Sequence, residues 1–201
     1  MLLYNMPSSG NSYKVRLLMA LLGKTCDSVD VEYLTDALDQ AKASGALPFG
    51  KAPVLHLDDG RMLPESNAIL CYLGEGTDLI PADPYARAQM LSWMFWEQNQ
   101  HEGVIAVRAA LRSYPHRAAQ ATPERMADLL ASGNGLLKIM DDHLAGRDWL
   151  VGDALSLADI CLYAYTHTAE TRGGYDLSAF PALRARLSRI AALPAYKGLF
   201  D

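Results

Sequence analysis

The pattern of apolar residues changes once along this chain, at residues 75–84, and this change limits the folds that the chain can adopt. Before it, short β-prone runs alternate with helical stretches; after it, the apolar residues recur at helical spacing and no run alternates as a strand does. The segment between them contains Gly76, Pro81 and Pro84, which interrupt regular structure. We therefore predict a small α/β domain over residues 1–75, a linker over 76–84 and an all-helical domain over 85–201.

The first domain is predicted to begin with a parallel β-α-β unit. Its first strand is the apolar run 2–4, and its helix carries apolar residues at helical spacing up to a C-cap at Gly23. Two strands joined through a helix run parallel, with a right-handed crossover. The second strand, which should have one wet face, is indicated by the alternation of Val29, Val31 and Tyr33 with acidic residues.

A helix and a hairpin complete the predicted α/β domain. Residues 35–45 form a short helix, for which Leu34 and Leu38 are the only large anchors. The hairpin is indicated by an Asp-Gly turn between two β-prone runs. The remaining elements are a strand, the turn, a return strand and a helix, over residues 53–57, 58–60, 61–63 and 65–73.

The second domain is predicted to be a helical bundle that opens with a long helix over residues 85–112. Ser156 and Asp159 have the spacing of a capping box, which gives them a structural role and not a catalytic one. Another helix begins at Thr122, an N-cap followed by proline. Two glycines within it each weaken it by about 1 kcal/mol relative to alanine; they are Gly133 and Gly135.

Composition narrows the classes of function. Of the 201 residues, 50% are hydrophobic, which is enough for a sizeable core. The formal charge is -5 and the sequence pI about 5.5, and no run of Lys or Arg offers a surface to nucleic acid. The three cysteines lie far apart, as free thiols in a reducing compartment do, so we expect a cytoplasmic protein. No apolar stretch approaches the roughly 20 residues that cross a bilayer, which argues against a membrane partner.

The chain resembles the cytosolic glutathione S-transferase family in four segments, which occur in the family's order and together span the chain. They are SSGNSYKVR at 8–16, GKAPVL at 50–55, PESNAIL at 64–70 and VGDALSLADICLYAY at 151–165. The resemblance implies a thioredoxin-like N-terminal domain, a helical C-terminal domain and a homodimer. It also implies glutathione as the co-substrate.

Glutathione must ionise its thiol to attack an electrophile, and a free thiol has a pKa of about 8.5. A helix N-terminus and a nearby hydroxyl can stabilise the thiolate, and Ser8, Ser9, Asn11 and Ser12 lie where the first helix begins. The resemblance implies Ser9 as the catalytic residue, with Asn11, used by the bacterial nu-like group, as helper or rival. Taken alone, these residues would only cap the helix. We assign Tyr4, which lies within the strand, to core packing.

The resemblance also implies the rest of a glutathione site. Pro53, which the family holds in cis, would expose the backbone of Ala52 to the cysteinyl unit. Lys51 would neutralise the glycine carboxylate, although a solvated loop charge explains it equally well. Ser66 would bind the γ-glutamyl carboxylate at a helix start and Glu65 its amino group, where an isolated pair would only cap the helix.

Two further groups of residues concern the second substrate and metals. Arg108 and Arg112, one helical turn apart, are candidates for a polar co-substrate, and a solvated or ion-paired face explains them as well. His101 and Glu102 begin like a zinc-protease motif, but Ile105 stands where the second histidine is needed. We therefore expect no metal.

The sequence departs from the family pattern in two places. SGALPFGK lacks the usual Asn-Pro before GK, which leaves only Gln40 as a guess for a glutathione contact from the second helix. The active loop has no cysteine and lacks the Ser-Ser-Cys-Ser pattern of the isomerase-type class. We predict a transferase that conjugates glutathione to a small electrophile. The alternatives are a nu-like glutathione-dependent disulfide or peroxide reductase and a non-catalytic interaction module with the same fold.

Overall fold

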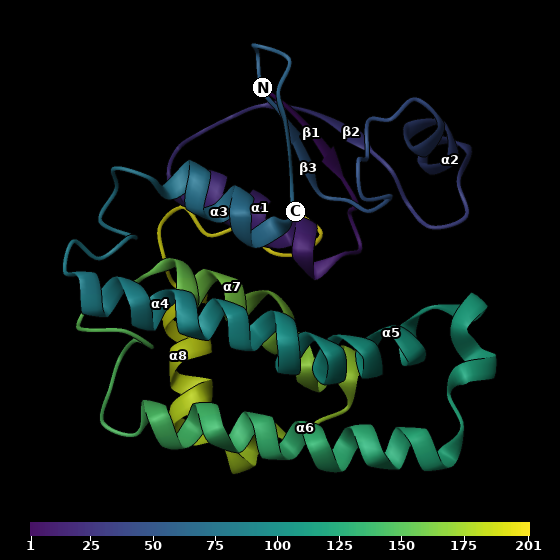
Figure 1. The fold of residues 1–201 in the computed structure, drawn as a ribbon. Helices are drawn as coiled ribbons and strands as arrows, with labels where there is room; N and C mark the ends of the chain where they lie inside the picture. The colour runs from purple at the N-terminus through teal and green to yellow at the C-terminus, as the bar shows by residue number, and fades with distance from the viewer. The chain divides into compact units, whose positions relative to one another are not determined.

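The computed structural model describes all 201 residues, which form two compact units (Figure 1). The first unit consists of Met1–Thr77 together with Ala191–Asp201, and the second of Asp78–Ile190. The last segment of the sequence, 191–201, thus belongs with the first unit, whereas its sequence pattern groups it with the helices.

A mixed sheet with strand order β2-β1-β3-β4 organises the first unit (Figure 1). β1 and β2 are parallel, and β3 is antiparallel to both of its neighbours, so the predicted β-α-β unit and hairpin are confirmed. In this register, the end of β1, the start of β3 and the end of β4 lie beside one another at the same end of the strands. The strands are β1 Leu2–Asn5, β2 Asp27–Asp30, β3 Val54–His56 and β4 Met62–Pro64.

Three helices complete the first unit. α1 and α3 lie side by side (Figure 1). α2 contributes Leu38 and Ala41 to an apolar cluster that also contains Met6, Val31 and Val54. The helices are α1 Gly10–Leu21, α2 Asp36–Ala43 and α3 Ser66–Gly74.

Gly23 ends α1 as predicted. Its backbone has φ 61°, in the left-handed region where a side chain would be strained. The N–H of Gly23 donates to the carbonyl of Ala20 at 3.0 Å, and that of Lys24 to Met19 at 2.9 Å. This pair of bonds is a Schellman motif, which satisfies carbonyls that the helix end would leave open.

The segment around the end of β2 differs from the prediction. The strand ends at Asp30, so of the three alternating residues only Val31 is buried, while Val29 and Tyr33 are exposed. Leu34 does not anchor α2, because its backbone has φ 63° and its side chain is 81% exposed. β2 lies at the edge of the sheet, where one flank is open, and the alternation of residues alone does not show which strand takes the edge.

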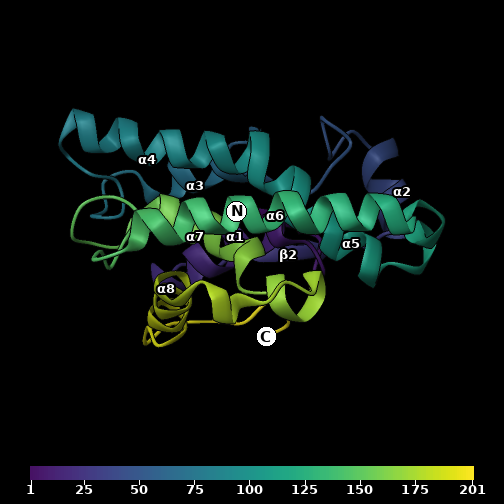
Figure 2. The ribbon, with the colours of Figure 1, turned by 90° about the horizontal axis from the view of Figure 1, so that it is seen from below.

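The second unit is all helical, as predicted. α4 continues through a π-helical segment, η1, into α5, and α6 runs alongside this stretch, while α8 runs across its direction (Figures 1 and 2). None of the helices combines the length and the apolar composition that a membrane crossing needs. The elements are α4 Pro84–Trp96, η1 Glu97–Ala106, α5 Val107–Ser113, η2 Pro115–Gln120, α6 Pro123–Leu144, α7 Leu157–Thr166, η3 Ala169–Gly173, η4 Leu177–Ala179 and α8 Pro181–Ala191.

Close packing explains one of the two glycines in α6. A Cβ at Gly133 would lie 2.3 Å from Oη of Tyr175, a hydroxyl that donates a hydrogen bond to the carbonyl of Leu129 at 2.9 Å. A Cβ at Gly135 would meet nothing within 4 Å. The loss of helix propensity therefore has a packing reason at Gly133 and none at Gly135.

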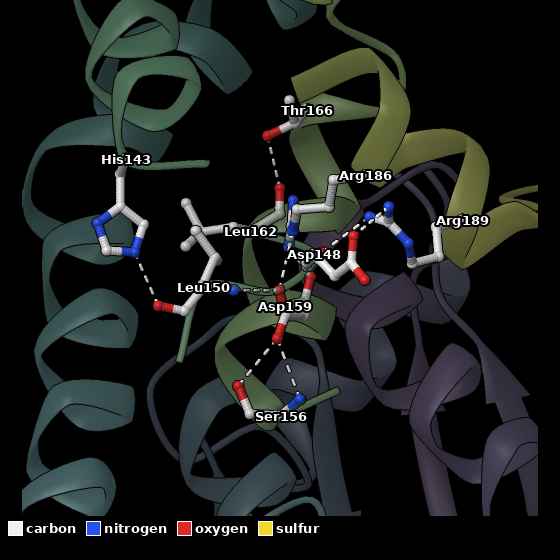
Figure 3. Close-up of polar contacts among 9 residues, drawn as sticks. All are labelled: His143, Asp148, Leu150, Ser156, Asp159, Leu162, Thr166, Arg186 and Arg189. Carbon is white, nitrogen blue, oxygen red and sulfur yellow. Dashed lines mark hydrogen bonds and ion pairs between the residues drawn. The ribbon is translucent and has the colours of Figure 1, made fainter. Parts of the chain in front are cut away.

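The capping box predicted at the start of α7 is present and belongs to a larger buried network (Figure 3). The backbone N–H and the hydroxyl of Ser156 both donate to Oδ2 of Asp159, each at 3.0 Å. Oδ1 of the same carboxylate accepts from the N–H of Leu150 at 3.0 Å and from Nε of Arg186 at 2.9 Å. Both charged side chains are fully buried, so each neutralises a charge that would otherwise be costly.

Candidate functional site

The loop from β1 to α1 contains a tight turn, residues 6–9, whose backbone is held by hydrogen bonds. The N–H of Ser9 donates to the carbonyl of Met6 at 3.0 Å, which closes the turn around a proline at its second position. The N–H of Met6 donates to the buried hydroxyl of Ser12 at 2.9 Å. That of Ser8 donates to the carboxylate of Glu32 at 3.1 Å. The backbone around Ser9, the residue expected to act on the thiol, is therefore held in place by hydrogen bonds.

Arg16 supports the same turn from one helical turn beyond Ser12. Its Nη2 donates to the carbonyl of Pro7 at 3.0 Å and to the carbonyl of Leu199, in the segment that returns to the first unit, at 2.8 Å. Burial lowers the pKa of Arg16 and nearby Asp30 opposes this shift, but an arginine remains charged at neutral pH. The sequence pattern does not predict that this turn is supported by Ser12, Arg16 and Glu32. Its only signal of the turn itself is the proline at position 7.

Ser9 is the N-cap residue of α1, yet its side chain makes no capping hydrogen bond. The capping explanation, which suffices for an isolated sequence of this kind, therefore does not account for this hydroxyl. The first turn of α1 also contains no acidic residue, so the partial positive charge of the helix N-terminus is not neutralised there. A hydroxyl donor beside the positive end of a helix suits an anion.

Asn11 and Ser66 meet where two helices begin. Ser66 is the first residue of α3 and is 4% exposed, and its hydroxyl donates to Oδ1 of Asn11, in the first turn of α1, at 3.1 Å. Neither helix has an acidic residue in its first turn. Two positive helix ends and two neutral polar side chains thus come together, an arrangement that favours negatively charged groups.

The sheet brings three further predicted residues to the end of β1. Ala52 and Pro53 precede β3, and Glu65 follows β4. All three therefore lie beside the end of β1. The peptide bond between Ala52 and Pro53 is cis, as expected. Glu65 has φ 71° and ψ 115°, a backbone conformation that costs free energy in a non-glycine residue and is concentrated at functional sites.

Three other predicted residues stand apart from these contacts. Lys51 and Gln40 are exposed side chains, and their contacts with glutathione stay predictions. Tyr4 packs against the apolar cluster around Met6, and its ring lies 4.7 Å from that of His56, which confirms its assignment to the core.

Arg108 is not available to a co-substrate, which corrects the prediction for this residue. It is 7% exposed, its Nε donates to the carbonyl of Gly173 at 2.8 Å, and its Nη1 donates to the carbonyl of Met126. A buried charge needs such partners, and they occupy the guanidinium. Arg112, one turn later, is exposed and stays a candidate.

No group of three or more His, Cys, Asp or Glu side chains is arranged to hold a metal ion, and the expectation of no metal stays a prediction.

Comparison with known proteins agrees with this geometry. Residues 3–78 match the family model for the glutathione S-transferase N-terminal domain, and residues 104–194 match the one for the C-terminal domain. A maleylacetoacetate isomerase from Rhizobium meliloti is 32% identical over 97% of this chain and 93% of its own length. The structure of a glutathione S-transferase from Pseudomonas fluorescens is 39% identical, with a TM-score of 0.92 over 100% of this chain and 98% of its own. A sphingomonad glutathione S-transferase, solved in complex with glutathione, is 28% identical, with a TM-score of 0.80 over 100% and 97%. The chain therefore belongs to the glutathione S-transferase family, with a thioredoxin-like N-terminal part and a helical C-terminal part.

Proposed function

We propose that this enzyme ionises the thiol of glutathione at Ser9 and conjugates the thiolate to a small electrophile. The observation that carries the proposal is the hydroxyl of Ser9, which stands at the N-terminus of α1 without capping it. As a donor to sulfur it would stabilise S⁻ more than S–H and so lower the pKa of the thiol. The N–H groups of the first turn of α1 act in the same direction.

The reaction needs no group beyond the two substrates. The thiol proton passes to solvent, and the sulfur lone pair then forms a bond to the electrophilic carbon. Either a leaving group departs with the electron pair of its bond, or the carbanion formed by addition takes a proton from water. Ser9 acts by holding the sulfur and its charge, which is electrostatic stabilisation by a donor already in position.

Glutathione would be held by its two charged ends. Ser66 would bind the γ-glutamyl carboxylate with its N–H and with its hydroxyl, whose one proton would turn from Asn11 to the ligand. Glu65 would pair with the amino group. The backbone of Ala52, next to Pro53, would pair with the cysteinyl unit, and Lys51 with the glycine carboxylate. The bond from Ser66 to Asn11 supports this assignment, because it brings the start of α3 next to the first turn of α1, which directly follows Ser9.

A second candidate function is glutathione-dependent disulfide reduction with Asn11 as the thiolate donor. The hydroxyl of Ser66 occupies Oδ1 of Asn11, which directs the opposite end of the amide, its NH₂ group, to other acceptors. Turnover of chlorodinitrobenzene and of hydroxyethyl disulfide by Ser9→Ala and Asn11→Ala separates the two. Loss of conjugation in Ser9→Ala supports the first function, and loss of disulfide reduction in Asn11→Ala alone supports the second.

A thermal-shift titration with glutathione tests binding before any turnover. We expect glutathione to stabilise the wild type, to stabilise Ser66→Ala much less, and to stabilise Ser9→Ala nearly as much as the wild type. Ser9→Ala should instead lose turnover with chlorodinitrobenzene. If glutathione neither stabilises the wild type nor elutes it from a glutathione matrix, the proposed function is wrong.

The active form would be a homodimer, as the family resemblance implies. Two aromatic side chains of α4, Tyr85 and Phe95, are largely exposed in the single chain, and exposed aromatic surface is a common mark of an interface. Sedimentation should give twice the chain mass of 22.0 kDa. A wild type that sediments as a monomer at micromolar concentration would contradict this.

A further inference from the structure

We infer that the C-terminal segment, residues 191–201, supports the active loop by fixing the guanidinium of Arg16, which makes Arg16 and Leu199 positioning residues for Ser9. The inference rests on the proposed function in one respect, namely that Ser9 acts on the thiol. The physical support itself is independent of any substrate, because it consists of contacts within the first unit.

Two hydrogen bonds hold the C-terminal segment on α1, and one apolar side chain of the segment is buried. The hydroxyl of Tyr13 donates to the carbonyl of Lys197 at 2.6 Å, and Nη2 of Arg16 donates to the carbonyl of Leu199 at 2.8 Å. The side chain of Leu199 is only 5% exposed, whereas the next residue, Phe200, is 73% exposed. Leu199 is therefore the apolar anchor of the segment, and Phe200 contributes little to its attachment.

One nitrogen atom links this segment to the active loop. Nη2 of Arg16 carries two hydrogens, and it donates to the carbonyl of Leu199 at 2.8 Å and to that of Pro7 at 3.0 Å. Pro7 lies in the turn that presents Ser9, two residues before it. Since a guanidinium is planar, fixing one side of it by Leu199 also fixes the direction of the bond to Pro7.

Nothing else on Arg16 orients its head group through a hydrogen bond. Its Nε is buried and has no hydrogen-bond partner within the chain. A cavity of about 590 Å³ separates much of the C-terminal segment from α1 and β1, and Arg16, Pro194 and Tyr196 contribute to its lining. The segment is therefore not packed tightly along its length. The guanidinium of Arg16 also lies over the ring of Tyr13, with 5.8 Å between Cζ and the ring centroid, so its orientation depends on this ring and on the two carbonyls named above.

The test compares Leu199→Ala with Phe200→Ala, two neighbours of the same segment that differ in burial. Hydrogen exchange at the amides of Ser8 and Ser9 reports on the turn without any substrate. Leu199→Ala should speed this exchange, and it should also lower conjugation at neutral pH by roughly tenfold or more, because a displaced catalytic group loses rate steeply. The pH profile of kcat/KM should move to higher pH, as the thiolate loses its fixed donor. Phe200→Ala should match the wild type in all three measurements.

Arg16→Lys and Tyr13→Phe keep the inference testable if Leu199→Ala does not fold. A lysine ammonium can reach one carbonyl but cannot bridge two in a fixed plane, so Arg16→Lys should behave as Leu199→Ala does. Tyr13→Phe removes the bond to Lys197, keeps the ring beneath Arg16, and should give a smaller effect in the same direction. If exchange rises in residues 196–200 of any of these variants while the amide of Ser9 and the pH profile stay as in the wild type, the inference is wrong. A wild type without glutathione turnover would refute the proposed function alone, since the exchange measurement would still decide the support.

Discussion

The hydroxyls of Ser9 and Thr122 stand at the same position of a helix and have different roles. Thr122 accepts a hydrogen bond from the N–H of Arg125 at 3.3 Å, while Ser9 caps nothing. We expect Ser9→Ala to lower kcat by about 10²-fold, the usual cost of one donor to a reacting anion. Its free energy of unfolding should change by less than about 0.5 kcal/mol.

Thr122→Ala is the matched control for this substitution. It should keep full turnover and lose about 1 kcal/mol of stability, because it removes a true N-cap. Turnover with chlorodinitrobenzene and urea unfolding measure the two quantities for both variants. An equal loss of stability in the two variants, with turnover intact in both, would mean that Ser9 is a cap after all.

For single residues, the sequence shows which side chains share a helix face but not which of them are buried. Arg108 and Arg112 look alike in sequence, one turn apart on one helix, yet the first is buried on two carbonyls and the second is exposed. The partners of Arg108 come from segments 18 and 65 residues away, so no local pattern contains them. The prediction that Leu34 anchors α2 is wrong for a similar reason. Its backbone is left-handed, a conformation that leucine rarely adopts and that no local pattern indicates.

Within α6, the two glycines make opposite predictions. Gly135→Ala should stabilise the protein by about 0.5–1 kcal/mol, because alanine is the better helix former and its Cβ meets no atom. Gly133→Ala should destabilise it by about 1–3 kcal/mol, because its Cβ would overlap the ring of Tyr175. Urea unfolding of both variants measures the difference. Stabilisation by both would show that Tyr175 can move aside without cost.

The contact between α7 and α8 gives a second prediction at the scale of elements. Arg186→Met leaves the carboxylate of Asp159 buried without its cation and should cost about 3–5 kcal/mol. The control is Lys138→Met, which breaks an exposed ion pair with Asp142 within α6 and should cost less than about 0.5 kcal/mol. Chemical denaturation distinguishes the two outcomes. Similar small losses would mean that water or a neighbouring group replaces Arg186.

Elements with strong local signals were predictable, and those defined by their neighbours were not. The Asp-Gly hairpin, the capping box at Ser156 and the proline after Thr122 each contain their own start or turn signal, and each is confirmed. The π-helical stretch η1 has no such signal, and its apolar spacing merges with that of α4. The edge position of β2 depends on which strands pair beside it, which is a property of the whole sheet.

For the molecule as a whole, Tyr175 predicts a loss of stability at alkaline pH. Burial raises the pKa of Tyr175 to about 12, with Arg108 opposing the shift. The unfolded chain ionises this tyrosine near pH 10, so the contribution is complete below that pH and is lost as the pH rises towards about 12. The loss should approach about 2–3 kcal/mol.

Thermal unfolding between pH 9 and 11.5 measures this contribution. The midpoint should fall more steeply for the wild type than for Tyr175→Phe, whose phenyl ring cannot ionise. The substitution also removes the bond to the carbonyl of Leu129, so Tyr175→Phe should be less stable at neutral pH and the two curves should converge at high pH. Parallel curves would show that ionisation elsewhere dominates the alkaline transition.

The C-terminal segment joins the first unit across a long stretch of chain, since Tyr13 and Arg16 bond carbonyls 184 and 183 residues later. Closing so long a loop costs little more entropy than closing a shorter one, because the cost grows only with the logarithm of length. During synthesis, however, the segment is made long after α1. A ribosome adds about 5–20 residues each second, so the segment emerges many seconds after the turn that it supports. A nascent chain would therefore carry the turn of Ser9 before the segment that supports it. If the inference above holds, its thiol chemistry would reach the full rate only after residues 191–201 have been made.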